Sequence, residues 1–309
     1  MSKIALLFAG QGAQVVGMGK DLAENAPAAK AWFERANSAL GYDLASICFS
    51  GPEPELTKTE HAQPGIFLVS WVALELLKER VPGLYFGATA GLSLGEFTAL
   101  TAAGAMSFEA GLNVVRQRGR FMQEACAATQ GGMAAIIGLN EATTREVCAE
   151  TGVVLANLNC PGQLVISGPI ENMAPACALA KAKGALRALP LPVAGAYHSP
   201  LMASAQAKLE AELAGVNLAA PTVPVIANVT AQPHGASDSI RARLVEQVTS
   251  SVRWEESMRF LVAQGYNRFI ELGPGRALSG FMKRIDKAAQ VLNVEDMPSL
   301  EATAQALAA

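Results

Sequence analysis

The chain has 309 residues, of which 51% are hydrophobic and only 17% charged, and its net charge is −3 at neutral pH. This length and composition predict a compact globular protein with one large domain or two smaller ones, and they exclude extended disorder. The charge balance gives no global basic footprint for nucleic acid. Five scattered cysteines without a C-x-x-C pair argue against a disulfide framework or a zinc or other metal site, and for a reducing compartment.

The N-terminal stretch Lys3–Phe8 favours a buried first strand over a signal peptide. Its apolar run is short, carries a single positive charge and leads directly into a Gly/Gln turn. The chain contains no apolar stretch of the roughly 18 residues that a transmembrane helix needs. We therefore expect a cytoplasmic protein that is not associated with a membrane.

The turn after this strand, Gly10–Gln14, contains a Gly-x-Gly pattern. It lacks the third glycine of a dinucleotide fingerprint and the Gly-Lys-Ser/Thr of a phosphate loop. Two interpretations remain from the pattern alone: an ordinary strand-to-helix turn, or a loop whose backbone N–H groups face a neighbouring site. A helical region then extends to about Leu40, Pro52–Glu60 is expected to be a polar loop, and Ala62–Glu79 is predicted to be a helix with an apolar face.

The five residues Gly91-Leu92-Ser93-Leu94-Gly95 stand between a β-like apolar stretch, 84–90, and a helix-like run, 96–103. Strand, Gly-x-Ser-x-Gly and helix in this order are typical of a nucleophile elbow. Such a turn exposes the serine hydroxyl at a helix N-terminus, where backbone N–H groups stabilise developing negative charge. Accidental spacing is the alternative, because the chain is rich in glycine.

The next predicted helix, Phe108–Met122, carries Arg116, Arg118 and Arg120. A spacing of two places these arginines on different faces, so at most one or two can face a site near Ser93. The others are expected to be solvated surface residues.

From Gly131 onwards the predicted elements follow the order strand, helix, strand, strand, helix, strand: 132–139, 141–151, 153–157, 162–168, 171–184 and 185–193. This βαββαβ order is that of a ferredoxin-like unit. We predict that residues 128–196 form an inserted small domain, and that residues 1–127 and 197–309 form a large α/β domain.

The remaining predicted elements again alternate between helix and strand: helix 199–215, strand 223–228, helices 239–248 and 257–264, strand 268–272 and helix 276–286. Strands that alternate with helices predict a mostly parallel sheet. An alanine-rich tail follows Glu301.

A nucleophilic serine needs a base, and the chain has only three histidines: His61, His198 and His234. His198 lies where the chain re-enters the large domain, which places it at the cleft between domains, where sites collect. The usual hydrolase triad fits poorly, since no histidine follows His234 and no aspartate lies between Asp43 and Asp238. A Ser–His pair without a carboxylate fits better.

Six motifs in order along the chain resemble malonyl-CoA:acyl carrier protein transacylases: 8–14 (FAGQGAQ), 91–96 (GLSLGE), 117–122 (QRGRFM), 157–163 (NLNCPGQ), 198–202 (HSPLM) and 271–275 (ELGPG). The resemblance covers nearly the whole chain. It implies an α/β-hydrolase-like large domain with an inserted ferredoxin-like domain, in agreement with the order of elements above.

The resemblance also implies roles for individual residues. Ser93 would attack the thioester of malonyl-CoA, and His198 would serve first as general base and then as acid. The backbone carbonyl of Gln247 would orient His198, and the backbone N–H groups of Gln11 and Leu94 would form the oxyanion hole.

Three further residues would bind the substrate. Arg118 would hold the malonyl carboxylate in a bidentate ion pair, and Met122 would contact the substrate beside it. Tyr197, an aromatic residue directly before the histidine, would leave no room for an α-methyl group, so we expect malonyl rather than methylmalonyl units. No cofactor or metal is expected besides the substrates.

The expected partner is an acyl carrier protein, whose phosphopantetheine thiol would accept the malonyl group from the acylated serine, and the protein is expected to act as a monomer. Because carrier proteins are acidic, we expect a local basic patch that includes Arg276, Lys283 and Arg284. The chain departs from the family's pattern at Leu92, where histidine is common, and at Ala9, where proline is usual.

One competing interpretation is a thioesterase-like hydrolase that uses the same Ser–His machinery with water as acceptor, and Arg118 argues against it. A second is an acyltransferase of a polyketide or malonate-decarboxylase pathway. A third is an inactive binding subunit of a larger synthase, against which the intact Ser93, His198 and Arg118 argue.

Overall fold

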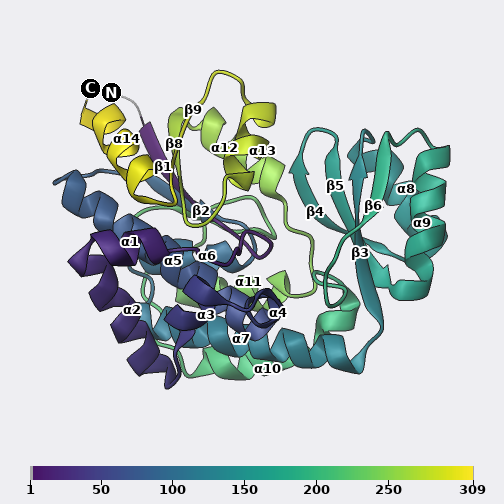
Figure 1. Cartoon of the computed structure of the whole chain (residues 1–309). Coiled ribbons are helices and arrows are strands. Elements are labelled where there is room, and N and C mark those ends of the chain that lie inside the picture. The colour runs from purple at the N-terminus through teal and green to yellow at the C-terminus, as the bar shows by residue number, and fades with distance from the viewer. Residues whose placement is uncertain (1–2, 309) are drawn as a thin grey trace.

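The computed structural model describes residues 3–308 and contains two separate β-sheets (Figure 1). The larger sheet has five strands in the order β7-β2-β1-β8-β9, and every neighbouring pair is parallel. Its strands are β1 (Lys3–Phe8), β2 (Ala88–Gly91), β7 (Val225–Ile226), β8 (Tyr266–Leu272) and β9 (Gln290–Val294). The predicted parallel sheet is confirmed.

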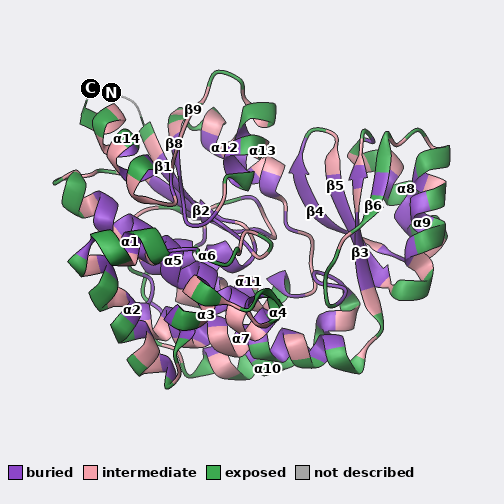
Figure 2. Ribbon diagram, in the orientation of Figure 1, coloured by how far each residue is buried: buried purple, intermediate pink, exposed green. Residues whose placement is uncertain are grey.

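Strand β1 is buried on both faces, as expected for the centre of a parallel sheet. Leu6 and Phe8 point into a core shared with α5, α6 and α7, whereas Ala5 and Leu7 point into a second core shared with α12 and α13. The alternation follows from the two-residue period of a strand. In Figure 2 the strands of this sheet are largely buried and the outer helices carry the exposed residues.

The helices before β3 are α1 (Lys20–Asn25), α2 (Pro27–Leu40), α3 (Leu44–Ser50), α4 (Glu53–Thr57), α5 (Thr59–Arg80), α6 (Leu94–Ala102) and α7 (Phe108–Ala128). The prediction of a loop over Pro52–Glu60 is wrong, because α4 and the first turn of α5 occupy it. Pro52 precedes α4 and Leu56 is buried, so one short turn of helix covers the core despite its polar sequence.

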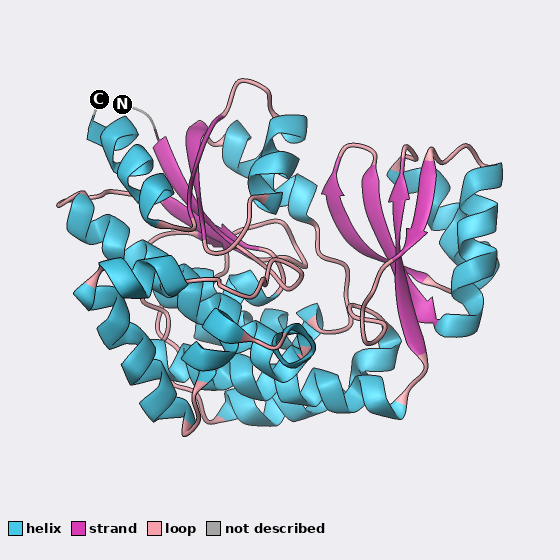
Figure 3. Ribbon diagram, viewed as in Figure 1, coloured by secondary structure: helices cyan, strands magenta, loops and turns pink. Residues whose placement is uncertain are grey.

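The smaller sheet is antiparallel, with the order β4-β5-β3-β6 (Figure 3). Its strands are β3 (Gly131–Ile137), β4 (Val154–Cys160), β5 (Gln163–Pro169) and β6 (Arg187–Pro190), and its helices are α8 (Glu141–Thr151) and α9 (Ile170–Ala182). Both helices pack on this sheet around one apolar core. This arrangement confirms the ferredoxin-like unit, whereas the boundaries at residues 128 and 196 stay a prediction.

The rest of the chain comprises η1 (Pro200–Met202), α10 (Ala203–Ala214), α11 (Ser237–Gln247), α12 (Trp254–Ala263), α13 (Ala277–Ile285) and α14 (Met297–Ala308). The tail after Glu301 belongs to α14, which packs against β9 and α5 through Leu300 and Thr303. Strand β9 and this helix were not predicted, since β9 has only five residues and the alanine-rich sequence of α14 carries little periodicity. Within residues 3–308, no helix combines the length and hydrophobicity needed to cross a membrane.

Direct backbone hydrogen bonds join the small sheet, at its edge strand β4, to the large unit. The Val252 N–H donates to the Ala156 carbonyl at 2.8 Å, and the Leu158 N–H donates to the Val252 carbonyl at 2.9 Å. The segment 248–253, which follows α11 in the large unit, thereby continues the small sheet by one short parallel bridge. These contacts fix the position of the small sheet beside the carboxyl ends of β1 and β2.

Candidate active site

Ser93 lies in the turn between β2 and α6, with φ 55° and ψ −105°. A non-glycine residue in this region is strained, as a nucleophile elbow requires. The flanking glycines leave no room for side chains: a Cβ on Gly91 would lie 1.9 Å from the Gly95 carbonyl oxygen, and one on Gly95 would lie 2.2 Å from the Phe8 carbonyl oxygen. The close crossing of this turn over the end of β1 explains why the sequence spaces two glycines around the serine.

The structure brings Ser93 and His198 together, as the sequence predicted, although they are 105 positions apart. Ser93 Oγ lies 2.8 Å from His198 Nε2, and His198 Nδ1 lies 2.9 Å from the backbone carbonyl of Gln247. Since that carbonyl can only accept, Nδ1 carries the proton and Nε2 offers its lone pair to the serine hydroxyl. His198 is itself held at φ 57°.

Burial is the main cause that lowers the pKa of His198 from 6.5 to about 4, and the nearby positive charge of Arg118 contributes to this shift. Its hydrogen bond to the Gln247 carbonyl acts in the opposite direction and is the smaller effect. The imidazole is therefore neutral at neutral pH and able to accept the serine proton.

Arg118, from α7, is fully buried and donates from one NH2 group to Ser93 Oγ at 3.0 Å and to Gln247 Oε1 at 3.0 Å. Its other terminal nitrogen donates to Gln63 Oε1, on α5, at 2.7 Å. Burial lowers the pKa of Arg118 to about 10 despite the opposing effect of the Glu96 charge, so the guanidinium remains cationic at neutral pH. A buried cation beside a nucleophile, with no carboxylate of residues 3–308 in hydrogen-bond contact, is suited to bind an anionic substrate group.

The other two arginines of α7 lie outside the site. Arg116 lies over the ring of Tyr42 and Arg120 forms a surface ion pair with Glu124 at 3.7 Å. Only Arg118 of the three arginines therefore faces the site, in agreement with the expectation that at most one or two could do so.

A cavity of about 760 Å³ opens in front of Ser93 and His198, between the two sheets. The turn 10–16 after β1 lines one side, and the open face of the small sheet contributes Met133, Asn157, Asn159 and Val165 to the other. Leu92, Leu278 and Phe281 form an apolar wall next to the serine. Leu92, the departure from the family's pattern, thus lies on the surface of the cavity itself.

Gln11, Met122 and Tyr197 also line this cavity. The Tyr197 hydroxyl lies 2.7 Å from Thr59 Oγ1, and Gln11 Nε2 donates to it at 3.4 Å. Burial raises the pKa of Tyr197 to about 12, so the phenol stays protonated. Leu94 is the first residue of α6, where backbone N–H groups lack partners within the helix.

The three residues of the expected basic patch lie at or near α13, but they differ in their contacts. Arg276 pairs with Glu295 at 2.6 Å, and Arg284 donates to Gln163 Oε1 and to the Pro161 carbonyl in the β4–β5 turn. Lys283 is exposed. Two of the three positive charges are therefore committed to contacts within the chain.

Sequence reasoning missed four polar residues that complete the site: Gln63, Glu96, Asn228 and His234. Asn228 Oδ1 accepts from the Ser93 N–H at 2.6 Å, and its Nδ2 donates to the Gly91 carbonyl at 2.8 Å. Its position just after β7, at the carboxyl end of a strand next to β2, was an available signal. Gln63, a buried amide directly before the apolar run 64–69 of α5, was another.

The acyl transferase domain family matches residues 5–301 of the chain, and the chain belongs to this family. Within it, the malonyl CoA-acyl carrier protein transacylase of Bacillus subtilis is 46% identical over 99% of this chain and 98% of its own length. An acyl-carrier-protein S-malonyltransferase from Bartonella henselae has the same fold, with a TM-score of 0.95 and 39% identity over 99% of this chain and 100% of its own. A malonyl-transacylase solved in complex with its type II polyketide synthase acyl-carrier protein also aligns, with a TM-score of 0.95 and 38% identity over 99% of this chain and 100% of its own.

Proposed function

We propose that this acyltransferase moves a malonyl group from malonyl-CoA to the phosphopantetheine thiol of an acyl carrier protein in fatty acid biosynthesis. The observation that carries the substrate choice is the buried guanidinium of Arg118, 3.0 Å from Ser93 Oγ. A malonyl group on that oxygen has its carboxylate carbon two bonds beyond the carbonyl carbon, which brings the carboxylate within reach of the guanidinium. An acetyl group offers no such anion.

In the first half-reaction Ser93 Oγ bonds to the thioester carbonyl carbon while its proton passes to His198 Nε2. The oxyanion that forms is stabilised by the backbone N–H groups of Gln11 and Leu94. When the C–S bond breaks, His198 returns the proton to the CoA sulfur. The second half-reaction reverses these steps, with the carrier-protein thiol as nucleophile and Ser93 as leaving group.

The Gln247 carbonyl replaces the carboxylate of a hydrolase triad in this mechanism. It fixes the tautomer and orientation of His198 through one hydrogen bond of 2.9 Å. Because it carries no full charge, it stabilises the imidazolium less than a carboxylate does. This suits a site in which the neighbouring Arg118 is already cationic.

Tyr197 and Met122 border the space beside the acyl group, and the bulk of Tyr197 favours malonyl over methylmalonyl. The neutral amides of Asn157 and Asn159 on β4 suit the amide-containing pantetheine arm, which both substrates share. The reaction needs only these two substrates.

All catalytic groups come from one chain, consistent with a monomer. The five free cysteines are all buried, which suits a cytoplasmic compartment.

The test is a two-step intact-mass experiment. Incubation with malonyl-CoA should add one malonyl group to the protein, and Ser93→Ala should prevent this. Holo carrier protein should then remove the adduct and gain it. Release of free malonate instead would indicate a hydrolase, and no adduct on the wild type would indicate a binding subunit.

A further inference from the structure

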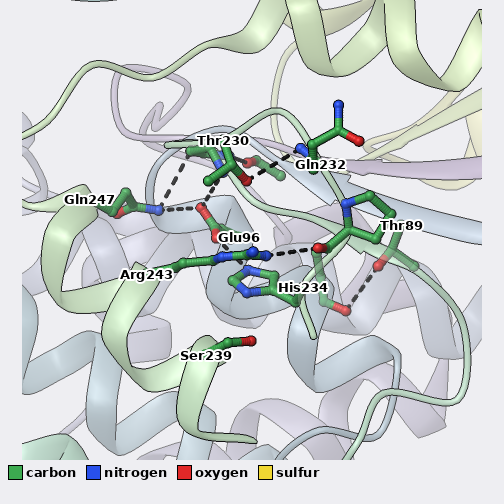
Figure 4. A network of polar contacts seen from close by, with 12 residues as sticks. Thr89, Glu96, Thr230, Gln232, His234, Ser239, Arg243 and Gln247 are labelled. Carbon is green, nitrogen blue, oxygen red and sulfur yellow. Dashed lines mark hydrogen bonds and ion pairs between the residues drawn. The ribbon is translucent and has the colours of Figure 1, made fainter. Parts of the chain in front are cut away.

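Glu96 and His234 form a buried contact directly behind the serine, and no step above uses it. Glu96 Oε1 lies 2.6 Å from His234 Nε2, and neither side chain has any exposed surface. Glu96 comes from the first turn of α6 and His234 from the segment after β7 (Figure 4). A carboxylate at this depth needs strong hydrogen bonds to offset the loss of hydration.

Three donors converge on this carboxylate. Besides His234, Gln247 Nε2 donates to Glu96 Oε2 at 2.6 Å and the Asn228 N–H donates to the same oxygen at 3.1 Å. His234 Nδ1 has no hydrogen-bond partner among residues 3–308. A buried N–H without an acceptor is costly, so we assign the imidazole proton to Nε2, where Glu96 accepts it.

Two of the three donors also hold the main chain of Ser93. Asn228 Oδ1 accepts from the Ser93 N–H, and Gln247 Nε2 donates to the Ser93 carbonyl at 3.0 Å. Both backbone polar groups of the strained serine thus bond to side chains of residues that Glu96 contacts, Gln247 through its amide and Asn228 through its main chain. In Figure 4, Gln247 and His234 approach Glu96 from different elements.

The orientation of the Gln247 amide is the critical detail. Its Nε2 faces Glu96, and its Oε1 therefore faces Arg118, from which it accepts at 3.0 Å. Because a carboxylate can only accept, Glu96 excludes the opposite orientation of the amide. In that opposite orientation an NH2 group would face the guanidinium, donor against donor.

We propose that Glu96 and His234 are positioning residues: they hold Gln247 in the orientation that fixes Arg118 beside Ser93, and so they sustain selection of malonyl over acetyl groups. The inference rests on the proposed function, since Arg118 has a role in selection only if a malonyl group is bound. Gln247 then acts twice, through its backbone on His198 and through its side chain on Arg118.

The test compares Glu96→Gln with the wild type in single-turnover acylation of Ser93 by malonyl-CoA and by acetyl-CoA. The new amide can turn its NH2 group towards Gln247 and Asn228, where it meets other donors. It can instead turn its NH2 group towards His234, and His234 Nε2 can then accept only if the imidazole proton moves to the unpartnered Nδ1. We expect the malonyl-to-acetyl rate ratio to fall about tenfold. The ratio does not depend on the fraction of folded enzyme, so lower stability alone leaves it unchanged.

Thr89→Val is the matched control. Thr89 is buried on β2, and its hydroxyl donates to the Ala99 carbonyl on α6 at 3.2 Å, outside the Glu96 contacts. This variant should lower the melting temperature and leave the ratio unchanged. The double variant Glu96→Gln/His234→Leu removes the tautomer exchange and should lower the ratio at least as far as Glu96→Gln.

A ratio within about twofold of wild type in both Glu96 variants would overturn the proposal, because one hydrogen bond to a charged group is worth more than that. If neither variant yields folded protein, the malonyl-to-acetyl rate ratio of His234→Leu is measured instead, and a ratio within about twofold of wild type would again overturn the proposal. Failure of the proposed function is distinguishable, because the wild type itself would then form no transferable malonyl adduct.

Discussion

The basicity of His198 is governed by its burial and by the charge of Arg118, which together lower its pKa to about 4. We therefore expect acylation of Ser93 to persist well below the ordinary histidine pKa of 6.5 and to fall to half near pH 4. Replacing Arg118 by Met should raise the pKa of His198, since it removes a positive charge. The imidazole Hε1 resonance, assigned by its loss in His198→Asn, measures both values. A midpoint at 6.5 in the wild type would contradict this account.

The same shift has a consequence for stability. The unfolded chain binds a proton at His198 below pH 6.5, whereas the folded chain does so only below about 4. The stability that this group contributes is fully present above pH 6.5 and is lost as pH falls towards 4. His198→Asn should unfold with a weaker pH dependence across this window.

At the scale of elements, helix α13 is tied to the small sheet by Arg284. Its two terminal nitrogens donate to the Pro161 carbonyl at 2.7 Å and to Gln163 Oε1 at 2.9 Å. Its place in the last turn of α13 also suits a positive charge. We expect Arg284→Ala to lower the melting temperature by about 2 °C, as the loss of roughly 1 kcal/mol does in a chain of this size.

Lys283→Ala is the control for this prediction, because Lys283 is exposed on the same helix. It should leave the melting temperature unchanged and raise the KM for an acidic carrier protein. Hydrogen exchange of the amides at 162 and 163 should increase only in Arg284→Ala. Equal effects of the two variants on exchange would show that Arg284 does not tie the helix to the sheet.

For the whole molecule, the sequence could predict those features that depend on residues close together in the chain. The parallel sheet, the βαββαβ unit and the elbow depend on periodicity and glycine spacing, and the scarcity of histidines pointed to His198. The Glu96–His234 contact joins residues 138 positions apart, and neither the elbow motif that ends at Glu96 nor the scarcity of histidines predicts that these two side chains meet. Gln63 and Asn228 likewise gain their roles only when packing brings α5 and β7 to the serine.

A further long-range coupling is the contact between segment 248–253 and strand β4. This segment continues directly from Gln247, whose carbonyl orients His198, so the small sheet helps to position the base. The Val252 N–H and carbonyl bond to Ala156 and Leu158, and Ser251 Oγ donates to the Leu155 carbonyl. The contact therefore connects the stability of the small sheet to the geometry of the site.

We expect the wild type to unfold in one calorimetric transition, because backbone hydrogen bonds join segment 248–253 of the large unit to the small sheet. Val252→Pro removes the N–H that donates to the Ala156 carbonyl at 2.8 Å, and it should separate unfolding into two transitions and slow acylation of Ser93. Val252→Ala keeps this N–H and loses only buried side-chain volume, so it should lower the midpoint of a single transition. Two transitions in the wild type, or the same single transition in both variants, would show that the sheets are not coupled through Val252.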